Sequence, residues 1–369
     1  MVISSKAPVR RRIKNAFSRA LAPACLALLP CAAPGGGDSE PARPAHVLFQ
    51  MDNDIVAGSD RDYTSGARLA YLRPIPEASL NRLQQWLREL SGAGRHPLFG
   101  RLTAFIDPEA IRYDWGVGLT QLMFTAEDPA ATAAPPGQRP YAGWLGAELS
   151  LHAKDQRGLS SVTLSLGTTG KPALARETQE WVHRNISGSP IFQGWASQTP
   201  AEPTVNLNLD RKRRLRALAE ASAGWPVGLD GYLEWGAALG NFRTDAHVGA
   251  LLRAGYNLPV KYQTPRLQLG TYAHELFLDG DPGGRDWSLS GFLGARGSAV
   301  AHDITLDGPL FRDHPGAVSS EPLVGELVAG VGIRWQRLSV TFSRTFRSRE
   351  FRGQDHGHQF GSLLVSLAL

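Results

Sequence analysis

From residue 46 onward, hydrophobic and polar residues alternate with period two in segments of about ten residues, separated by clusters of Gly, Pro, Asp and Asn. This alternation predicts β-strands, because successive side chains of a strand point to opposite faces. The pattern predicts twelve strands, of which the sixth is poorly defined. They span 46–55, 64–74, 113–125, 141–153, 160–169, part of 204–224, 229–241, 246–257, 286–302, 322–335, 337–348 and 358–369.

The number and length of these strands favour an all-β fold that is a single transmembrane antiparallel β-barrel, since such barrels use an even number of strands of about this length. The last segment, HQFGSLLVSLAL, places four apolar residues on one face and Ser362 and Ser366 on the other, as a closing strand would. Aromatic residues near strand ends are predicted to form interfacial girdles: Tyr71, Trp115, Phe124, Tyr141, Trp144, Trp235, Tyr256, Trp335 and Phe342. Taken alone, the alternation also fits a soluble β-sandwich.

Two segments have helical instead of strand periodicity. Residues 79–90, SLNRLQQWLREL, carry leucines at helical spacing and predict an amphipathic helix in a long connection. Residues 172–186, PALARETQEWVHRNI, place Leu174, Thr178, Trp181, Val182 and Ile186 along one side of a second helix, which Gly188 and Pro190 end.

The first 33 residues have a basic start, an apolar middle and small residues at the end, which is the pattern of a secretory signal peptide. The prediction is a signal peptide over 1–33, a linker over 34–45 and a barrel domain over 46–369. Both cysteines, Cys25 and Cys31, fall in the leader, so the exported chain is not a disulfide scaffold. A disordered basic tail and a lipoprotein signal ending at Cys31 are the alternatives.

The formal charge of +5 comes from the leader, which holds six bases and no acid; the remaining chain has 33 bases against 34 acids. A nucleic-acid-binding protein is therefore not indicated. After the leader no uncharged apolar run reaches the roughly 18 residues that a membrane-spanning helix needs. Two destinations remain, the periplasm for a soluble protein and the outer membrane for a barrel.

Counting strands brings three polar segments to one end of the predicted barrel. If the first strand starts in the periplasm, the loops after strands one, three and five are all extracellular. These loops contain DNDIVAGSDRDYTSG, GQRPYAG and ETQEWVHRN. In the first strand Val47, Phe49 and Met51 share a side with Asn53, so a lipid-facing row turns polar at the rim. Asp54 has the opposite parity, and a local bulge would have to redirect one of the two.

The residues gathered at this end suggest ester hydrolysis. On the helix, His183 lies four residues after Gln179 and could act as a general base for water. Asn53 and Asp54 supply oxygen ligands for a hard cation such as Ca²⁺, which could polarise an ester carbonyl. The chain has no G-x-S-x-G elbow to supply a nucleophile.

Each feature also has a structural interpretation. A lone histidine on a helix is more often structural than catalytic, and the acidic loop, which lacks the EF-hand glycine and terminal glutamate, could be a solvated turn. Arg139 could cap a neighbouring turn, and His302 and Asp303 are interpreted as structural.

Together these segments resemble the outer-membrane lipid A 3′-O-deacylases, a family of twelve-stranded barrels. The resemblance rests on NDIVAGSDRDYTSG, RPYAGWL, ETQEWVHR followed by QGWASQ, and the C-terminal SREFRGQDHGHQFGSLLVSLAL, and it covers nearly everything after residue 46. It implies a calcium-dependent hydrolase that removes the 3′-O-linked acyloxyacyl chain of lipid A. The enzyme would lie in the outer membrane of a Gram-negative bacterium and would carry a short helix in an extracellular loop. Its partner would be lipopolysaccharide, and the chain is expected to be a monomer.

The resemblance also implies roles for individual residues. His183 would be the base, Asn53 and Asp54 would be site residues and metal ligands, and Thr64 would supply a catalytic hydroxyl. Arg139, Gln179 and Ser65 would contact the substrate, with the Arg139 guanidinium suited to a lipid A phosphate.

The sequence departs from the family pattern at one position. Where an acid is expected about six residues after the histidine, this chain has Ser189 and Pro190. Three explanations remain open: calcium is held by fewer acids, Glu177 or Glu180 substitutes, or the barrel binds lipid without efficient turnover. Two alternatives to a lipid A deacylase in the outer membrane remain. The first is a non-catalytic barrel of the same fold, and the second is a secreted soluble β enzyme.

Overall fold

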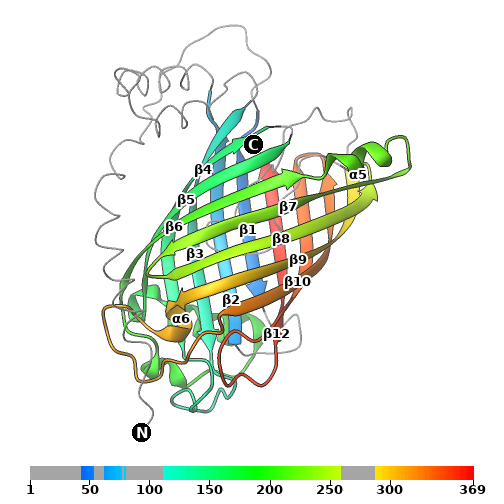
Figure 1. Cartoon of the computed structure of the whole chain (residues 1–369). Helices are drawn as coiled ribbons and strands as arrows, with labels where there is room; N and C mark the ends of the chain where they lie inside the picture. The colour runs from blue at the N-terminus through cyan, green and yellow to red at the C-terminus, as the bar shows by residue number, and fades with distance from the viewer. Residues whose placement is uncertain (1–42, 54–61, 77–78, 80–110, 156, 259–286) are drawn as a thin grey trace, which may run out of the picture.

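The computed structural model of the chain describes residues 43–53, 62–76, 79, 111–155, 157–258 and 287–369. Within them, twelve strands pair in sequence order, and β1 also pairs with β12, so the sheet is a closed antiparallel barrel (Figure 1). The strands are β1 (His46–Asn53), β2 (Asp62–Pro74), β3 (Arg112–Thr125), β4 (Ala142–Lys154), β5 (Gly158–Thr169), β6 (Pro203–Arg214), β7 (Val227–Gly240), β8 (Arg243–Tyr256), β9 (Trp287–Asp303), β10 (Leu323–Trp335), β11 (Leu338–Arg347) and β12 (His358–Ala368).

The predicted all-β barrel of twelve strands is confirmed, and most strand ends fall within a few residues of the prediction. The poorly defined sixth strand is β6, which is followed by the short helix α5 (Arg216–Ala221). Nearly all of the helix predicted over 79–90, the predicted signal peptide and most of the 34–45 linker lie outside the described residues. No helix in the described part of the chain is long and apolar enough to cross a membrane.

The helix predicted over 172–186 is confirmed in the loop between β5 and β6. It consists of a 3₁₀ turn, η2 (Lys171–Ala173), the helix α4 (Ala175–Val182) and a π-helical turn, η3 (His183–Ser187), and the 3₁₀ turn η4 (Gly194–Ser197) follows it. We call the end of the barrel that carries this loop the α4 end. The short helix α6 (Ile304–Asp307), in the loop after β9, lies at the same end (Figure 1). The opposite end, where β1 starts and β12 finishes, is the terminal end.

Side chains alternate between the two faces of the barrel wall in the way a membrane requires. Outward positions are apolar and exposed, as at Phe49, Leu69, Leu119, Leu149, Leu293 and Leu327. Inward positions are polar and paired: Arg68 meets Glu148 at 2.9 Å, and Arg253 meets Asp230 at 2.7 Å. An apolar outside around a polar, paired inside is the pattern of an outer-membrane barrel.

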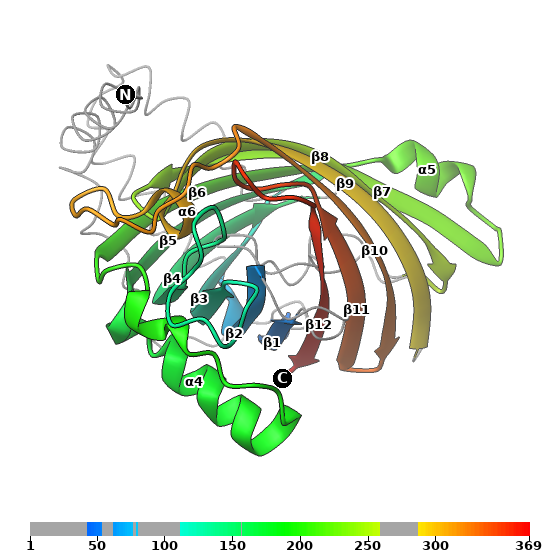
Figure 2. The same ribbon diagram turned by 90° about the horizontal axis from the view of Figure 1, so that it is seen from below.

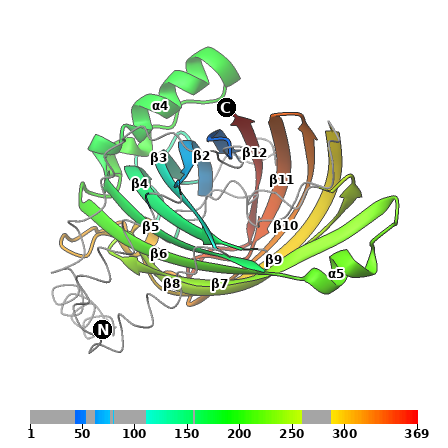
Figure 3. The ribbon, with the colours of Figure 1, turned by 90° about the horizontal axis from the view of Figure 1, so that it is seen from above.

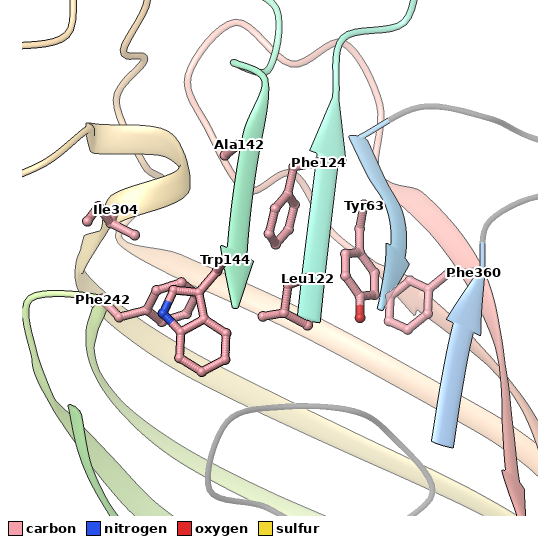
Figure 4. Close-up of a cluster of buried hydrophobic side chains, with 8 residues drawn as sticks. All are labelled: Tyr63, Leu122, Phe124, Ala142, Trp144, Phe242, Ile304 and Phe360. Carbon is pink, nitrogen blue, oxygen red and sulfur yellow. The ribbon is translucent and has the colours of Figure 1, made fainter. Parts of the chain in front are cut away.

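Aromatic side chains fill the inside of the α4 end. Figure 4 shows Tyr63, Phe124, Trp144, Phe242 and Phe360 turned inward from different strands and loops, and the same cluster includes Leu122, Ala142 and Ile304. The prediction that Phe124 and Trp144 belong to an interfacial girdle is therefore wrong, because these rings pack inside the barrel. Tyr141 is also fully buried. Trp235, Tyr256, Trp335 and Phe342 are exposed on the outer wall, as predicted.

Candidate active site

A row of outward positions crosses four strands of the outer wall at the α4 end. In the strand register, Asn53 of β1 lies opposite Ser65 of β2, Ser65 lies opposite Met123 of β3, and Met123 lies opposite Gly143 of β4. Neighbouring strands are about 4.8 Å apart, so Asn53 is about 10 Å from Met123 along this row. Asn53 follows the exposed Phe49 and Met51 on the same face of β1. The predicted row that is apolar below and polar at the rim is confirmed for the described residues.

A bulge in β2 adds Thr64 to this region. The pairing of β2 with β3 shifts between Tyr63 and Ser65, so Thr64 is the extra residue. Its hydroxyl lies 2.6 Å from the hydroxyl of Thr125, while the Ser65 hydroxyl donates to the carbonyl of Asp52. A bulge was expected near Asp54, but Asp54 lies outside the described residues and the bulge that the structure describes is in β2.

Helix α4 lies outside the ring of strands and packs against the end of this row (Figure 2, Figure 3). Gly143 allows the close approach, because a Cβ at this position would be 2.5 Å from the Cβ of Ala175. Next to it, the Gln121 side chain of β3 donates to the carbonyl of Ala173 at 2.7 Å. The helix is thus fixed to β3 and β4 at its first turn.

We expect Gly143→Val to separate α4 from the wall. The added side chain would occupy the space that Ala175 now fills, so the helix must move while the strand pairing stays intact. Hydrogen–deuterium exchange should then rise at least about tenfold in residues 175–187, which is a loss of about 1.4 kcal/mol of local protection. Gly297→Val is the matched control, since a Cβ there meets nothing within 4 Å. Equal exchange in both variants would contradict the assigned contact.

The side of α4 that faces the barrel is its polar side. Ala175, Gln179 and His183 are spaced four apart and are all buried, at 1%, 3% and 4% exposure. The apolar residues of the opposite side, Leu174 and Trp181, are exposed. The apolar side of the helix is therefore the exposed one, as it is on the outer wall of the barrel.

His183 is held in one tautomer by the backbone. Its Nδ1 lies 2.6 Å from the carbonyl oxygen of Pro190, and a carbonyl can only accept, so Nδ1 is the donor. In the neutral ring Nε2 then carries the lone pair, as a general base requires. The position where the family pattern has an acid therefore contributes a main-chain carbonyl that orients the histidine.

An aromatic cluster between the loop and the wall positions the polar face of α4. The Trp195 indole donates to Gln179 Oε1 at 2.7 Å, and Phe192 packs near the His183 ring with centroids 6.1 Å apart. Tyr141, which follows Arg139 and Pro140, packs on both Trp195 and Phe192. The sequence reading did not predict these roles for the three aromatic residues. The sequence held one signal for these contacts, the Gly–Trp pair in QGWASQ. In the structure a glycine is needed at position 194, because a Cβ there would be 2.1 Å from the Tyr141 ring.

Arg139 is not brought to the outer face. Its guanidinium is buried inside the α4 end, where it meets Glu350 at 2.6 Å and Thr305 at 3.1 Å and stacks over Phe124. Contact of Arg139 with a lipid A phosphate thus stays a prediction. In the structure the guanidinium is bound to Glu350 and Thr305 instead.

His302 and Asp303, which were interpreted as structural, lie at the end of β9. His302 is bonded to the carbonyl of Asn241, and Asp303 caps α6 and pairs with Arg243 at 2.9 Å. Both therefore have structural partners at the α4 end.

The predicted cation ligands are only partly described. Asn53 lies at the rim of the outer wall, Asp54 is outside the described residues, and no group of three His, Cys, Asp or Glu side chains suited to a metal occurs in the described ranges. Glu180 is engaged by Arg176 at 2.7 Å and Arg184 at 2.8 Å. A hard cation prefers oxygen ligands, and the neutral side-chain oxygens of Asn53, Thr64 and Ser65 are of this kind.

The apolar outer wall, polar interior and closed strand order define the class of the protein, an outer-membrane β-barrel. The sequence model of the family described as outer membrane protein LpxR matches residues 21–369. The chain belongs to the LpxR outer membrane protein family, and its location is the outer membrane of a Gram-negative bacterium. This membership confirms the resemblance found in the motifs.

Two solved structures are similar to the chain, and the first of them supports the fold. LpxR from Salmonella typhimurium has a TM-score of 0.66 and 16% sequence identity, over 88% of this chain and 100% of that chain. The β domain of the Bordetella autotransporter BrkA has a TM-score of 0.40 and 12% identity, over 88% of this chain and 98% of that one. No curated protein sequence matches the chain.

Proposed function

We propose that this barrel is a lipid A 3′-O-deacylase whose site lies between the outer wall and α4. The observation that carries the proposal is the row that runs from the lipid-facing Phe49 and Met51 to the polar Asn53, next to the helix that carries His183. A lipid ester in the membrane can reach this row laterally, with its acyl chains against the apolar wall. Membership of the LpxR family supports the same substrate class.

In the proposed reaction, Nε2 of His183 takes a proton from water as the water oxygen bonds to the ester carbonyl carbon. The tetrahedral intermediate then expels the lipid A hydroxyl, which receives the proton from His183, and the released chain leaves as a fatty acid. Gln179 is fixed by Trp195, and its buried side-chain amide nitrogen forms no hydrogen bond within the described residues, so we propose that it donates to a substrate oxygen that enters between α4 and the wall. The hydrogen bond from Nδ1 to the Pro190 carbonyl would orient the His183 ring in both its neutral and its protonated form.

Calcium is proposed as the cofactor, held by Asn53 and Asp54 with the hydroxyl of Thr64 or Ser65 nearby. When bound there, a divalent cation would polarise the ester carbonyl and stabilise the negative charge that develops on its oxygen. The chain's own contribution would be to present oxygen ligands at the rim of the lipid-facing row.

The second candidate is a non-catalytic barrel of the same fold that binds lipid. It is favoured by the lack of a carboxylate at residues 189 and 190 and by the engagement of Glu180 with two arginines. The two candidates differ in turnover and share the location and the lipid.

Mass spectrometry of lipid A from a strain that expresses the chain tests the proposal. We expect a loss of mass equal to one acyloxyacyl substituent, compared with the same strain carrying an empty vector. The conversion should stop in purified membranes treated with a chelator and resume when Ca²⁺ is added. Unchanged lipid A in the presence of folded, membrane-inserted protein would favour the non-catalytic barrel.

A further inference from the structure

Three exposed arginines lie close together in the strand register at the terminal end of the barrel. Arg211 and Arg213 are exposed outward positions of β6, and the exposed Arg157 lies in the turn between β4 and β5. The backbone of Arg214 donates to the carbonyl of Arg157 at 2.8 Å, which joins the turn to the end of β6. We call Arg157, Arg211 and Arg213 the arginine cluster.

The outward row of β6 changes from apolar to cationic at this cluster. Going toward the terminal end, the row reads Val205, Leu207, Leu209, Arg211 and Arg213, while the residues between them point inward and are buried. A guanidinium facing hydrocarbon is destabilising in a depth-dependent way and is tolerated near the membrane interface. The change at Arg211 therefore marks the level at which the hydrocarbon ends and the lipid head groups begin.

An aromatic side chain at the same level supports this assignment. Trp235 of β7 lies directly opposite Arg211 in the strand register and is exposed on the outer wall. Tryptophan is enriched at the head-group level of membranes, where its ring is partly apolar and its N–H can reach polar groups. The cluster and Trp235 together form a surface that is cationic on one side and apolar on the other.

Within the described residues, the positive charge of the cluster is not balanced by ion pairs with carboxylates. Among the described residues no carboxylate forms an ion pair with Arg157, Arg211 or Arg213, although Arg211 donates to the hydroxyl of Ser160. The nearby Asp155 accepts from the backbone of the turn. Lys212 pairs with Asp210 inside the barrel, on the other face of the strand. The described residues thus leave three exposed arginines at this level without a carboxylate partner, and Arg211 alone among them has a side-chain hydrogen bond, to the neutral Ser160.

We propose that the arginine cluster is a binding site for an anionic phospholipid of the leaflet at the terminal end, which is the periplasmic leaflet if β1 starts in the periplasm. Guanidinium groups bind phosphate oxygens in a bidentate way, and Leu207 and Leu209 continue the wall toward the acyl chains. The site lies on the β4–β5 turn and on β6 at the terminal end, apart from the candidate active site at the α4 end, and it does not depend on any enzymatic activity.

Binding of single lipids to the purified full chain in detergent tests the proposal by native mass spectrometry. We expect phosphatidylglycerol to bind more tightly than phosphatidylcholine, with a loss of about fivefold in phosphatidylglycerol affinity for each arginine changed to glutamine and about a hundredfold for all three. The control is the triple variant Arg312→Gln, Arg349→Gln and Arg352→Gln, which removes three exposed arginines at the α4 end and should keep the wild-type affinity.

Two outcomes would overturn the proposal. One is equal affinity of the wild-type chain for the two lipids, and the other is an equal loss of phosphatidylglycerol binding in the cluster variant and the control variant. If the triple cluster variant does not fold, Arg213→Gln alone decides, with an expected loss of about fivefold. An unchanged affinity in a folded Arg213→Gln chain would exclude the site. Failure of lipid A deacylation would leave all of these results unaffected.

Discussion

A chain with His183 replaced by alanine is expected to reach the outer membrane folded and to lose deacylation by a factor of about 10²–10⁴, the usual contribution of a general base. The reason is the hydrogen bond from Nδ1 to the Pro190 carbonyl, which leaves the Nε2 lone pair as the base. The rate of acyl release from lipid A by purified membranes is the measurement. The folded state is checked in parallel by the change in gel mobility of the barrel on heating.

Two further variants separate a base from a structural histidine. His183→Gln keeps a donor that can reach the Pro190 carbonyl but has no basic nitrogen, so its activity should be as low as that of the alanine variant. Asn185→Ala changes an exposed neighbour on the same turn, which donates to the carbonyl of Trp181, and should retain the wild-type rate. Full activity in the glutamine variant would show that His183 only positions the loop.

Most of the barrel was predictable because the membrane imposes a strict alternation. Phe49, Leu69 and Leu119 face lipid while Gln50, Arg68 and Thr120 face the interior, so each strand shows its two faces in the sequence. The alternation was not applied correctly to the aromatic residues at the α4 end. Phe124 and Trp144 look like girdle residues by position, but they occupy inward positions and pack inside the barrel, where Arg139 stacks over Phe124 and the Trp144 indole donates to Thr204.

The sequence was enough to select the residues of the candidate site, but not to predict which residues they contact. Strand parity gives Asn53 its outward position, but which face of α4 packs on the wall depends on Gly143 and Ala175, which are far apart in the chain. The helical spacing places Gln179 and His183 on one face of the helix, and in the structure this face is buried against the wall. Arg139 could not be assigned from local sequence, because its partner Glu350 is 211 residues away.

Replacing Glu350 with alanine is expected to lower the free energy of unfolding by about 3–5 kcal/mol, the cost of leaving buried charges without their partner. The carboxylate lies in the loop between β11 and β12 and is 4% exposed. It pairs with Arg139 at 2.6 Å and with Arg347 at 3.2 Å. Removing it leaves two buried guanidinium groups close together without this shared negative charge. Urea unfolding of the purified barrel measures the change.

The pKa of Glu350 also reflects its pairing with Arg139 and Arg347. Burial alone would raise this pKa, but the charges of Arg139 and Arg347 outweigh burial and hold the pKa of the carboxyl well below its usual range. Because the folded-state pKa is the lower one, the stabilisation is complete above the unfolded-chain pKa of about 4.3 and is lost as the pH falls toward the folded-state pKa. The destabilisation of the alanine variant should therefore be constant near neutral pH.

Glu180→Ala is the matched control, because this carboxylate also pairs with two arginines and differs mainly in its surroundings. Its partners Arg176 and Arg184 have side chains that are 56% and 61% exposed, so water can solvate them once the carboxylate is gone. We expect a loss of no more than about 1 kcal/mol. A similar loss in both variants would mean that burial at the α4 end does not set the strength of the Glu350 pairs. A large difference would show that burial sets the strength of the Glu350 pairs with Arg139 and Arg347 inside the barrel.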